Sequence, residues 1–424
     1  MNNRQPIYDL IIVGAGPAGL EMALAAAELD LNFLVLERDD IAANIRSWGH
    51  VRLFSPWSMN VSPRGRQVSG IDISAPDAIC AGNEFVENYL EPLAQSAELD
   101  DRVKTGVQVI KIGRKGAYKN TLIGDPRRAG LPFMVLADAR GNDGKLTERQ
   151  YLARSVVDAS GVYGAHRWLG PGGIPCPGER RLSGRISYLL EDVSARGNEF
   201  DGKNIALVGD GYSACAMLES FAELQREGCD LRVTWVVSSD SEFPIQLIMN
   251  DPLMYRNELG GLANRMARRG SSEEDYWLRY LRGATVVGLE GDGAGGALKV
   301  SLETGESDEL EILSADYVYA MIGYTPDRTL YEELQVHECW ATSGPMKMAS
   351  SLLAQAGADC LSVKAGGAET LQNPEPGFYI IGAKSYGRHS NFLIVRLREQ
   401  VKIVSELMVD HLKSARPDYE PSAE

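Results

Sequence analysis

Three glycines and one acidic residue near the start of the sequence have the types and spacing needed to bind a dinucleotide. Gly14, Gly16 and Gly19 form the pattern GxGxxG, and Glu37 follows. In such a pattern the first glycine permits a tight turn, the second lets backbone N–H groups approach a pyrophosphate, and the third allows close helix packing. The acid can accept hydrogen bonds from the adenosine ribose. The predicted binding residues are Gly14, Gly16, Pro17, Ala18, Gly19, Glu37 and Arg38.

The residues around these glycines have the composition of a strand, a helix and a second strand. Residues 10–13 form an apolar run, an Ala-rich segment follows Gly19, and a second apolar run at 33–36 ends on Glu37. Ala favours helix and short apolar runs bounded by turns favour buried strands. This βαβ unit would place a pyrophosphate at the positive end of the helix dipole.

A second copy of the motif begins at Gly209. Gly209, Gly211 and Ala214 form GxGxxA, which is an accepted variant, between an apolar run at 205–208 and a helical pattern at 215–226. Both copies are followed by strand patterns and by a strand that ends in glycine, so the plan is repeated. We predict an α/β fold with two Rossmann-like dinucleotide-binding domains, each with a β-meander. The second site is predicted to use Gly209, Gly211, Tyr212, Ser213, Ala214 and Ser238.

The predicted domain boundaries follow from this repeat. Gly and Pro are dense in residues 164–179, as expected where a chain crosses between domains. We expect residues 1–170 and 324–424 to form the first domain, completed by a long helix near the C-terminus, and residues 171–323 to form the second. A helical excursion is expected around residues 244–280, either near the nicotinamide or substrate or as a solvated insertion.

Composition limits the partners. There are 43 basic and 58 acidic residues, which give a net charge of −15, so a nucleic acid or an anionic membrane is not expected as a partner. No apolar stretch is long enough to span a bilayer. The six cysteines include no CxxC and the five histidines no metal-ligand spacing, so we predict neither a redox disulfide nor a metal. Scattered thiols fit a reducing compartment. We expect a cytoplasmic protein with a small-molecule substrate and a homodimer as a candidate assembly.

The ordered motifs resemble the two-dinucleotide-domain flavoproteins that include thioredoxin reductase and the flavin-containing monooxygenases. The resemblance is carried by WGHVRLFSPW at 48–57, WLGPGGIP at 168–175 and YIIGAKSYGR at 379–388. It implies FAD on the first domain and NADPH, or NADH, on the second. The FAD-site residues that it adds are Ser47, Trp48, Val109, Ala159, Gly161 and Gly382. The start of the last helix near Asn391 would aim its dipole at the pyrimidine edge of a reduced flavin.

Ordinary structural explanations remain open for several of these positions. Trp48 equally fits a side chain that plugs a core, and Asn391 or Ser390 fits a simple helix cap. The sequence also departs from the family where Gly382-Ala383 replaces a Gly-Asp pair and where paired cysteines are absent. His166 comes five residues after Gly161, one too many for the Baeyer–Villiger fingerprint.

Coenzyme choice rests on the residues after the second domain's second strand. Many relatives have arginine there for the 2′-phosphate of NADPH, but this chain has Ser238-Ser239, and no acid is present to bind a free 2′-hydroxyl. Serine can hydrogen-bond phosphate, and Arg256, Arg268 or Arg269 could fold over it, which favours NADPH.

Two nucleotide domains without redox cysteines favour a flavin-dependent monooxygenase. NAD(P)H would reduce FAD, the reduced flavin would capture O2 as a hydroperoxide, and one oxygen would pass to a small nucleophilic substrate. Asn60 is the candidate catalytic residue, as a hydrogen-bond partner of that hydroperoxide, although a turn asparagine before Val61-Ser62-Pro63 is the simpler explanation. The alternatives are an NAD(P)H dehydrogenase or reductase without oxygen transfer, and a nucleotide-binding regulator without turnover.

Overall fold

A computed structural model describes residues 6–141, 143–272, 276–291, 295–305, 309–355, 361, 366–390 and 392–415. The chain divides into two compact units. The first contains residues within 1–46, 55–165 and 325–424, and the second contains residues within 47–54 and 166–324. The short segment 47–54 therefore belongs to the second unit, although both of its neighbours in sequence belong to the first.

The sheet of the first unit has the strand order β3-β2-β1-β6-β5-β4, and β15 pairs with β6. The pairs that join β3, β2, β1, β6 and β15 are parallel, and β4, β5 and β6 form an antiparallel meander. Residues 10–13 of β1 and the whole of β2 and β15 are continuous buried apolar runs, as expected where both faces of a parallel sheet are covered. The bounds are β1 (Ile7–Val13), β2 (Phe33–Leu36), β3 (Val103–Lys104), β4 (Val107–Arg114), β5 (Phe133–Arg140), β6 (Leu146–Asp158) and β15 (Phe378–Ile380).

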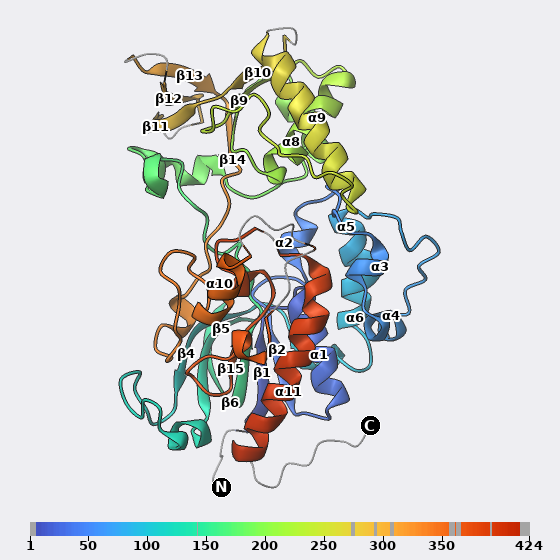
Figure 1. Cartoon of the computed structure of the whole chain (residues 1–424), viewed down its shortest axis with the longest axis vertical. Coiled ribbons are helices and arrows are strands. Elements are labelled where there is room, and N and C mark those ends of the chain that lie inside the picture. The colour runs from blue at the N-terminus through green and yellow to red at the C-terminus, as the bar shows by residue number, and fades with distance from the viewer. Residues whose placement is uncertain are drawn as a thin grey trace. The chain divides into compact units, whose positions relative to one another are not determined.

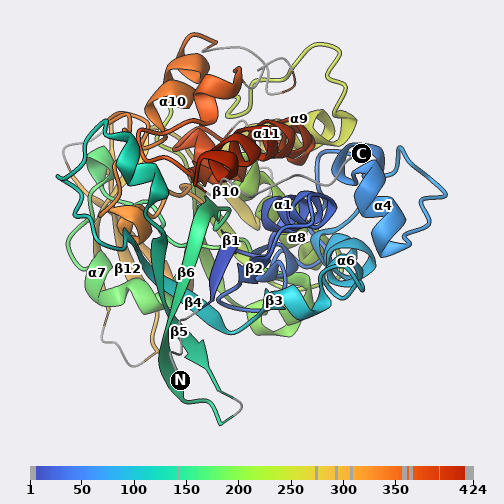
Figure 2. The same cartoon turned by 90° about the horizontal axis from the view of Figure 1, so that it is seen from below.

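Two long helices of the first unit pack on each other and on this sheet. Helix α1 (Pro17–Glu28) contacts β1 and β2, and α11 (Leu397–Ala415) contacts β6 and α1 (Figure 1). Figure 2 shows the same neighbours from below. The shorter helices are α2 (Ala43–Arg46), α3 (Trp57–Asn60), α4 (Pro63–Ser69), α5 (Gly82–Phe85), α6 (Glu91–Ala94) and α10 (Met346–Leu353), with a π-helix at Val86–Leu90. On α11 the buried side chains recur every three or four residues, which is the pattern of a helix with one apolar face: Leu397, Val401, Val404, Met408 and Leu412.

The second unit repeats the plan. Its parallel sheet has the order β10-β9-β8-β14-β7, and a separate antiparallel sheet has the order β11-β12-β13. Helices α8 (Tyr212–Arg226) and α9 (Met254–Ser271) pack together, and α7 (Glu179–Leu182) contacts β11. The strand bounds are β7 (Ile186–Ser187), β8 (Asn204–Val208), β9 (Arg232–Val236), β10 (Leu278–Leu281), β11 (Ala284–Glu290), β12 (Leu298–Thr304), β13 (Glu311–Ala315) and β14 (Tyr317–Ala320).

This architecture confirms the predicted α/β fold with two Rossmann-like units, each with a β-meander. The expected excursion contains a helix, α9, but that helix begins at Met254, and residues 237–253 before it are not helical. Among the described residues, no helix has the length and apolar character required to cross a membrane.

Candidate functional site

The first glycine-rich turn joins β1 to α1, and two of its glycines are required by packing. Gly14 has a φ of +99°, and a Cβ on it would lie 2.8 Å from the carbonyl oxygen of Ala159. A Cβ on Gly19 would lie 1.9 Å from the carbonyl oxygen of Gly14. Side chains at these positions cannot be accommodated without backbone movement, so Gly14 and Gly19 set the shape of the turn.

Gly16 is different, because no heavy atom of the described residues lies within 4 Å of a Cβ built on it. It is the N-cap of α1, where no side chain caps the helix, and the first turn of α1 contains no acidic residue. The first N–H groups of a helix lack partners inside the helix and carry its positive dipole end. An anion such as a pyrophosphate therefore fits above Gly16, beside Pro17 and Ala18.

Glu37 follows β2 and is oriented by the backbone around this turn. Its Oε2 accepts a hydrogen bond of 2.7 Å from Ala15 N, and its Oε1 accepts one of 2.9 Å from Asp39 N. Each carboxylate oxygen retains a further lone pair, so Glu37 can also accept hydrogen bonds from ribose hydroxyls. The neighbouring Arg38 is exposed, and its Nε donates to Asp39 instead.

Two further turns flank the start of α1. Gly161, which follows β6, has a φ of +72° and open space where a Cβ would be. Gly382, which follows β15, has a φ of +71°, and a Cβ on it would lie 3.0 Å from the Cβ of Ala18. The Gly382 turn is therefore packed against the first turn of α1, and Gln400 of α11 accepts a hydrogen bond of 2.8 Å from Gly382 N.

A buried ion pair links these two turns, and the sequence did not predict it. Lys384 Nζ lies 2.6 Å from Asp158 Oδ2 and 2.9 Å from Ser160 Oγ. The other carboxylate oxygen of Asp158 accepts hydrogen bonds from Ser160 N and Ser160 Oγ. Both charged side chains are fully buried. The signal in the sequence was a lysine in the glycine turn after one apolar strand and an aspartate at the end of another.

Three other predicted residues of the first site are less informative. Val109 lies on β4 with its side chain in the core. Asn60 is buried at the end of α3, where its Oδ1 accepts a hydrogen bond of 2.5 Å from Ser55 Oγ and its Nδ2 donates one of 2.8 Å to Ser55 O. Asn60 thus closes its own loop, and its catalytic role stays a prediction. Asn391 lies outside the described residues.

Ser47 and Trp48 begin the segment 47–54, which packs within the second unit. His50 Nδ1 lies 2.7 Å from Asp192 Oδ1, and the guanidinium of Arg52 lies 3.9 Å from the ring centre of Tyr255. Phe54 meets the Tyr212 ring edge-on at 5.0 Å. The structure therefore brings Tyr212, at the start of α8, together with this segment. Their predicted roles at the cofactors stay predictions.

The second glycine-rich turn joins β8 to α8 and has the geometry of the first. Gly209 has a φ of +130°, and a Cβ on it would lie 2.3 Å from the carbonyl oxygen of Met321. Gly211 is the N-cap of α8, again without a side-chain cap or an acid in the first turn, and no described atom lies within 4 Å of a Cβ placed there. Ala214 is buried and Ser213 is exposed. A second anion can therefore bind at this helix start.

The two turns differ in the residue after the second strand. Gly14 N donates to Leu36 O, and Gly209 N donates to Val236 O, so Val237 corresponds to Glu37. Val237 is buried, and Ser238 next to it is exposed. The second site therefore offers no acid at the position that corresponds to Glu37 in the first. Arg256, a predicted phosphate contact, is instead buried against Asp251 through hydrogen bonds of 2.8 and 2.7 Å.

Comparison with known proteins agrees with this geometry. A family model described as pyridine nucleotide-disulphide oxidoreductase matches residues 11–120. A thioredoxin reductase of Bacillus subtilis is 28% identical over 218 residues, which are 50% of this chain and 49% of the relative. The chain thus matches about half the length of that relative.

Solved structures match over almost the whole chain. Bacillithiol disulfide reductase from Bacillus cereus has a TM-score of 0.64 at 18% identity and covers 95% of this chain and 99% of its own. The ornithine N-hydroxylase of Kutzneria sp. 744, solved with reduced FAD, NADP+ and L-ornithine, has a TM-score of 0.63 at 16% identity and covers 95% and 99%. At these identities the likeness establishes the fold alone. The predicted resemblance to two-dinucleotide-domain flavoproteins is confirmed.

Proposed function

We propose that this protein is an FAD-dependent oxidoreductase that accepts a hydride from NAD(P)H and transfers one atom of O2 to a small nucleophilic substrate. The observation that carries the proposal is the pair of glycine-rich turns. Gly16 and Gly211 each leave open space over an uncapped helix start, so one chain offers two pyrophosphate sites.

The two sites take different nucleotides because their second strands end differently. Glu37 suits the free ribose hydroxyls of FAD, whose adenosine carries no 2′-phosphate, and no acid stands at Val237. FAD is therefore assigned to the first unit and the nicotinamide nucleotide to the second. The ornithine N-hydroxylase that shares this fold was solved with both nucleotides.

In this assignment FAD supplies hydride acceptance and the reaction with O2. The N–H groups at the start of α1 bind the diphosphate, and Glu37 binds the adenosine ribose. The Lys384–Asp158 pair holds the turns at Gly161 and Gly382 in place beside α1. In the overall reaction NAD(P)H supplies two electrons, one oxygen atom enters the substrate, and the other leaves as water.

The described cysteines favour oxygen chemistry over dithiol chemistry. Burial raises the pKa of the thiols of Cys80, Cys176 and Cys215 to about 12, so these thiols are poor nucleophiles at neutral pH. The two remaining described cysteines, Cys229 and Cys339, belong to different units. Within the described residues, nothing supports a cysteine pair next to the first site.

A reductase without oxygen transfer is the second candidate. It is favoured by the curated relatives, among them the thioredoxin reductase of Bacillus subtilis. Such an enzyme would pass the electrons of NAD(P)H to an external acceptor, for example a quinone, a metal centre or a small carrier.

Stopped-flow absorbance of the FAD-loaded protein distinguishes these candidates. The protein is mixed anaerobically with NADPH, then NADH, and the reduced protein is mixed with O2 in the presence of amine, thiol or thioether substrates. A transient absorbance unlike that of oxidised or reduced flavin, followed by an oxygenated product, supports the monooxygenase. Flavin bleaching without either result supports the reductase.

Two other outcomes contradict both candidates. Retention of FAD without reduction by either coenzyme would indicate a nucleotide-binding regulator. Failure of the purified protein to contain or take up FAD would refute the assignment of the first site. Flavin absorbance of the purified protein is therefore the first measurement.

A further inference from the structure

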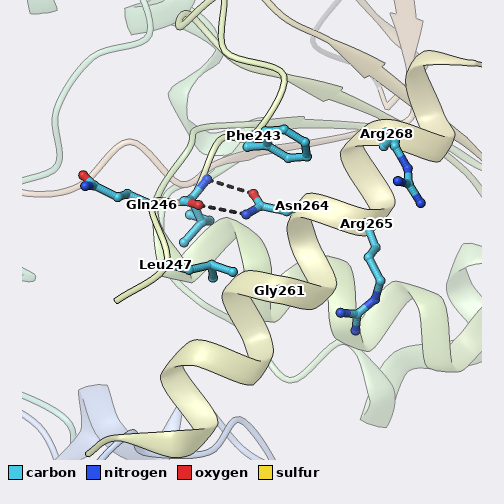
Figure 3. Close-up of a pocket in the computed structure, with 8 residues that line it drawn as sticks. Phe243, Gln246, Leu247, Gly261, Asn264, Arg265 and Arg268 are labelled. Carbon is cyan, nitrogen blue, oxygen red and sulfur yellow. Dashed lines mark hydrogen bonds between the residues drawn. The ribbon is translucent and has the colours of Figure 1, made fainter. Parts of the chain in front are cut away.

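A pocket of about 590 Å³ lies in the second unit, between helix α9 and the non-helical segment that precedes it (Figure 3). Phe243 and Leu247 come from that segment, and Gly261, Asn264, Arg265 and Arg268 come from α9. In Figure 3 the segment runs along one side of α9, and the two arginines extend from the helix on the other side. Neither glycine-rich turn contributes to this pocket, and the assignments above leave it without a role.

The wall of the pocket is held in place by specific contacts. Asn264 is buried, its Nδ2 donates a hydrogen bond of 2.8 Å to Ile245 O, and its Oδ1 accepts one of 3.0 Å from Ile245 N. These are the two dashed lines in Figure 3. A Cβ on Gly260 would lie 2.8 Å from Ile245 Cγ2, so a glycine is needed for this close approach. These contacts fix the segment against α9, so the shape of the pocket is determined by the fold.

The pocket combines exposed apolar surface with two cations. The side chains of Phe243 and Leu247 are 52% and 47% exposed. Arg265 and Arg268 are exposed one turn apart on α9, and no described acidic residue forms an ion pair with either of them. In a chain with a net charge of −15, two such arginines in the lining of a pocket that also contains an aromatic ring suit a ligand with a flat ring and a multiply charged anion.

The pocket follows directly on the predicted ribose position of the second site. Phe243 comes seven residues after Val236, the last residue of β9. The intervening turn is tied to the end of β10, because Gly283 N donates to Ser239 O and Arg282 Nε lies 3.3 Å from Asp240 Oδ1. In a dinucleotide-binding fold the adenosine lies beyond the carboxyl end of this second strand. A coenzyme bound at Gly211 would therefore extend toward the pocket.

We propose that the pocket receives the 2′-phosphorylated adenosine of NADPH. Arg265 and Arg268 bind the 2′-phosphate, because guanidinium groups form paired charge-assisted hydrogen bonds with phosphate oxygens. Phe243 packs against the adenine ring. The proposal rests on the proposed function, since it assumes that the second unit binds a nicotinamide nucleotide, and it adds that NADPH is preferred to NADH.

The test uses two nucleotide fragments and needs no flavin reduction. Calorimetry of the FAD-loaded protein measures the affinity for 2′,5′-ADP and for 5′-ADP, which lacks the 2′-phosphate. We expect the wild-type protein to prefer 2′,5′-ADP. Arg265→Ala and Arg268→Ala should each lower the affinity for 2′,5′-ADP about tenfold or more, because each removes a charged hydrogen-bond donor. The affinity for 5′-ADP should change little.

Matched variants separate the pocket from general charge effects. Arg226→Ala removes the same charge from an exposed position on α8 that does not line the pocket, and should leave both affinities within about twofold. Phe243→Ala should lower the affinity for both nucleotides by a similar factor, since both contain adenine. Flavin content and far-UV circular dichroism verify that each variant is folded.

Equal binding of the two nucleotides by the wild-type protein, or an unchanged preference in the Arg265→Ala/Arg268→Ala variant, would overturn the inference. These results are distinguishable from failure of the proposed function. If the protein retains FAD and NAD(P)H reduces it, the function stands while the pocket assignment falls. If neither FAD nor any adenine nucleotide binds, both fall together.

Discussion

Lys384 and Asp158 form an ion pair of 2.6 Å whose two side chains are fully buried, between the turn after β15 and the turn after β6. Ser160 joins the pair through hydrogen bonds to both partners. Lys384 directly follows Ala383, which occupies the position where the family resemblance leads us to expect an aspartate. The turns at the first site are thus joined by an interaction between residues 226 positions apart in the sequence.

Replacing one partner of this pair should destabilise the first unit strongly. Lys384→Met leaves the Asp158 carboxylate buried without its cation, and breaking a buried pair in this way costs about 3–5 kcal/mol of unfolding free energy. Urea denaturation followed by circular dichroism measures the loss. The variant Lys384→Met/Asp158→Asn contains no buried charge here and should recover most of the stability. A loss below about 1 kcal/mol in the single variant would contradict the assigned burial of the pair.

Alanine at the two kinds of glycine should separate folding from binding. Gly16 has a φ of −81° and open space for a Cβ, so Gly16→Ala should keep the unfolding free energy within about 0.5 kcal/mol while a methyl group obstructs the diphosphate. The flavin content of purified Gly16→Ala protein should therefore fall. Gly211→Ala should instead lower the affinity for NAD(P)H without loss of flavin. Gly14→Ala is the contrasting variant. Gly14 has a φ of +99° and a Cβ there would collide with Ala159 O, so this variant should have a lower unfolding free energy. Normal flavin binding by a folded Gly16→Ala protein would refute the first site.

Glu37→Gln should weaken FAD binding without unfolding the protein. The carboxylate accepts hydrogen bonds from Ala15 N and Asp39 N, and a neutral amide accepts ribose donors less strongly. We expect the dissociation constant of FAD to rise about tenfold, since hydrogen bonds to charged groups are worth about 1.5–3 kcal/mol. Fluorescence of released flavin measures this constant. Asp39→Asn, at an exposed neighbour, should change it by less than about twofold, and an equal effect of both variants would argue against the assigned role.

His411 should make stability depend on pH in mildly acidic solution. Burial within α11 lowers its pKa from the ordinary value of 6.5, an effect that the nearby Arg114 and Arg154 reinforce, although Arg154 O accepts a hydrogen bond from the ring. Below about pH 6.5 the unfolded chain binds a proton that the folded chain does not. The unfolding free energy is therefore highest above the pKa of His411 in the unfolded chain. It falls as the pH drops from that value toward the lower pKa of His411 in the folded protein.

The measurement for His411 is a difference between variants. Wild-type unfolding free energy should fall by at most about 1.4 kcal/mol per pH unit in this window, and His411→Gln should flatten the curve. His337→Gln, at an exposed histidine, should keep the wild-type slope. Parallel curves for wild type and His411→Gln would show that this group does not titrate as expected.

The local parts of the first site could be predicted because their chemistry is encoded in neighbouring residues. Gly14, Gly19 and Glu37 act within one βαβ unit, where spacing alone determines their roles. The spacing of apolar residues at 84–97 predicts a single amphipathic helix, whereas the chain forms α5, a π-helix and α6 in succession. Pro92 lies in the first turn of α6, where its missing N–H is tolerated.

Pairings between distant residues could not be predicted in this way. Lys384 and Asp158 are 226 residues apart, and His50 and Asp192 are 142 apart. Neither pair follows from periodicity or composition, because each depends on which strand ends the topology brings together. A local pairing was also missed. Arg256 is a candidate phosphate-binding residue in the sequence, but in the structure it forms a buried ion pair with the nearby Asp251.

The placement of residues 47–54 in the second unit has a consequence for how this gene could be divided. His50 and Arg52 supply the partners of Asp192 and Glu219, and Phe54 covers Tyr212. A fragment that encodes only residues 166–324 would lack all three and would leave both carboxylates without these hydrogen-bond partners. The second unit is thus not encoded by one continuous stretch, and exchange of residues 166–324 between homologous genes would require matching changes more than a hundred codons upstream.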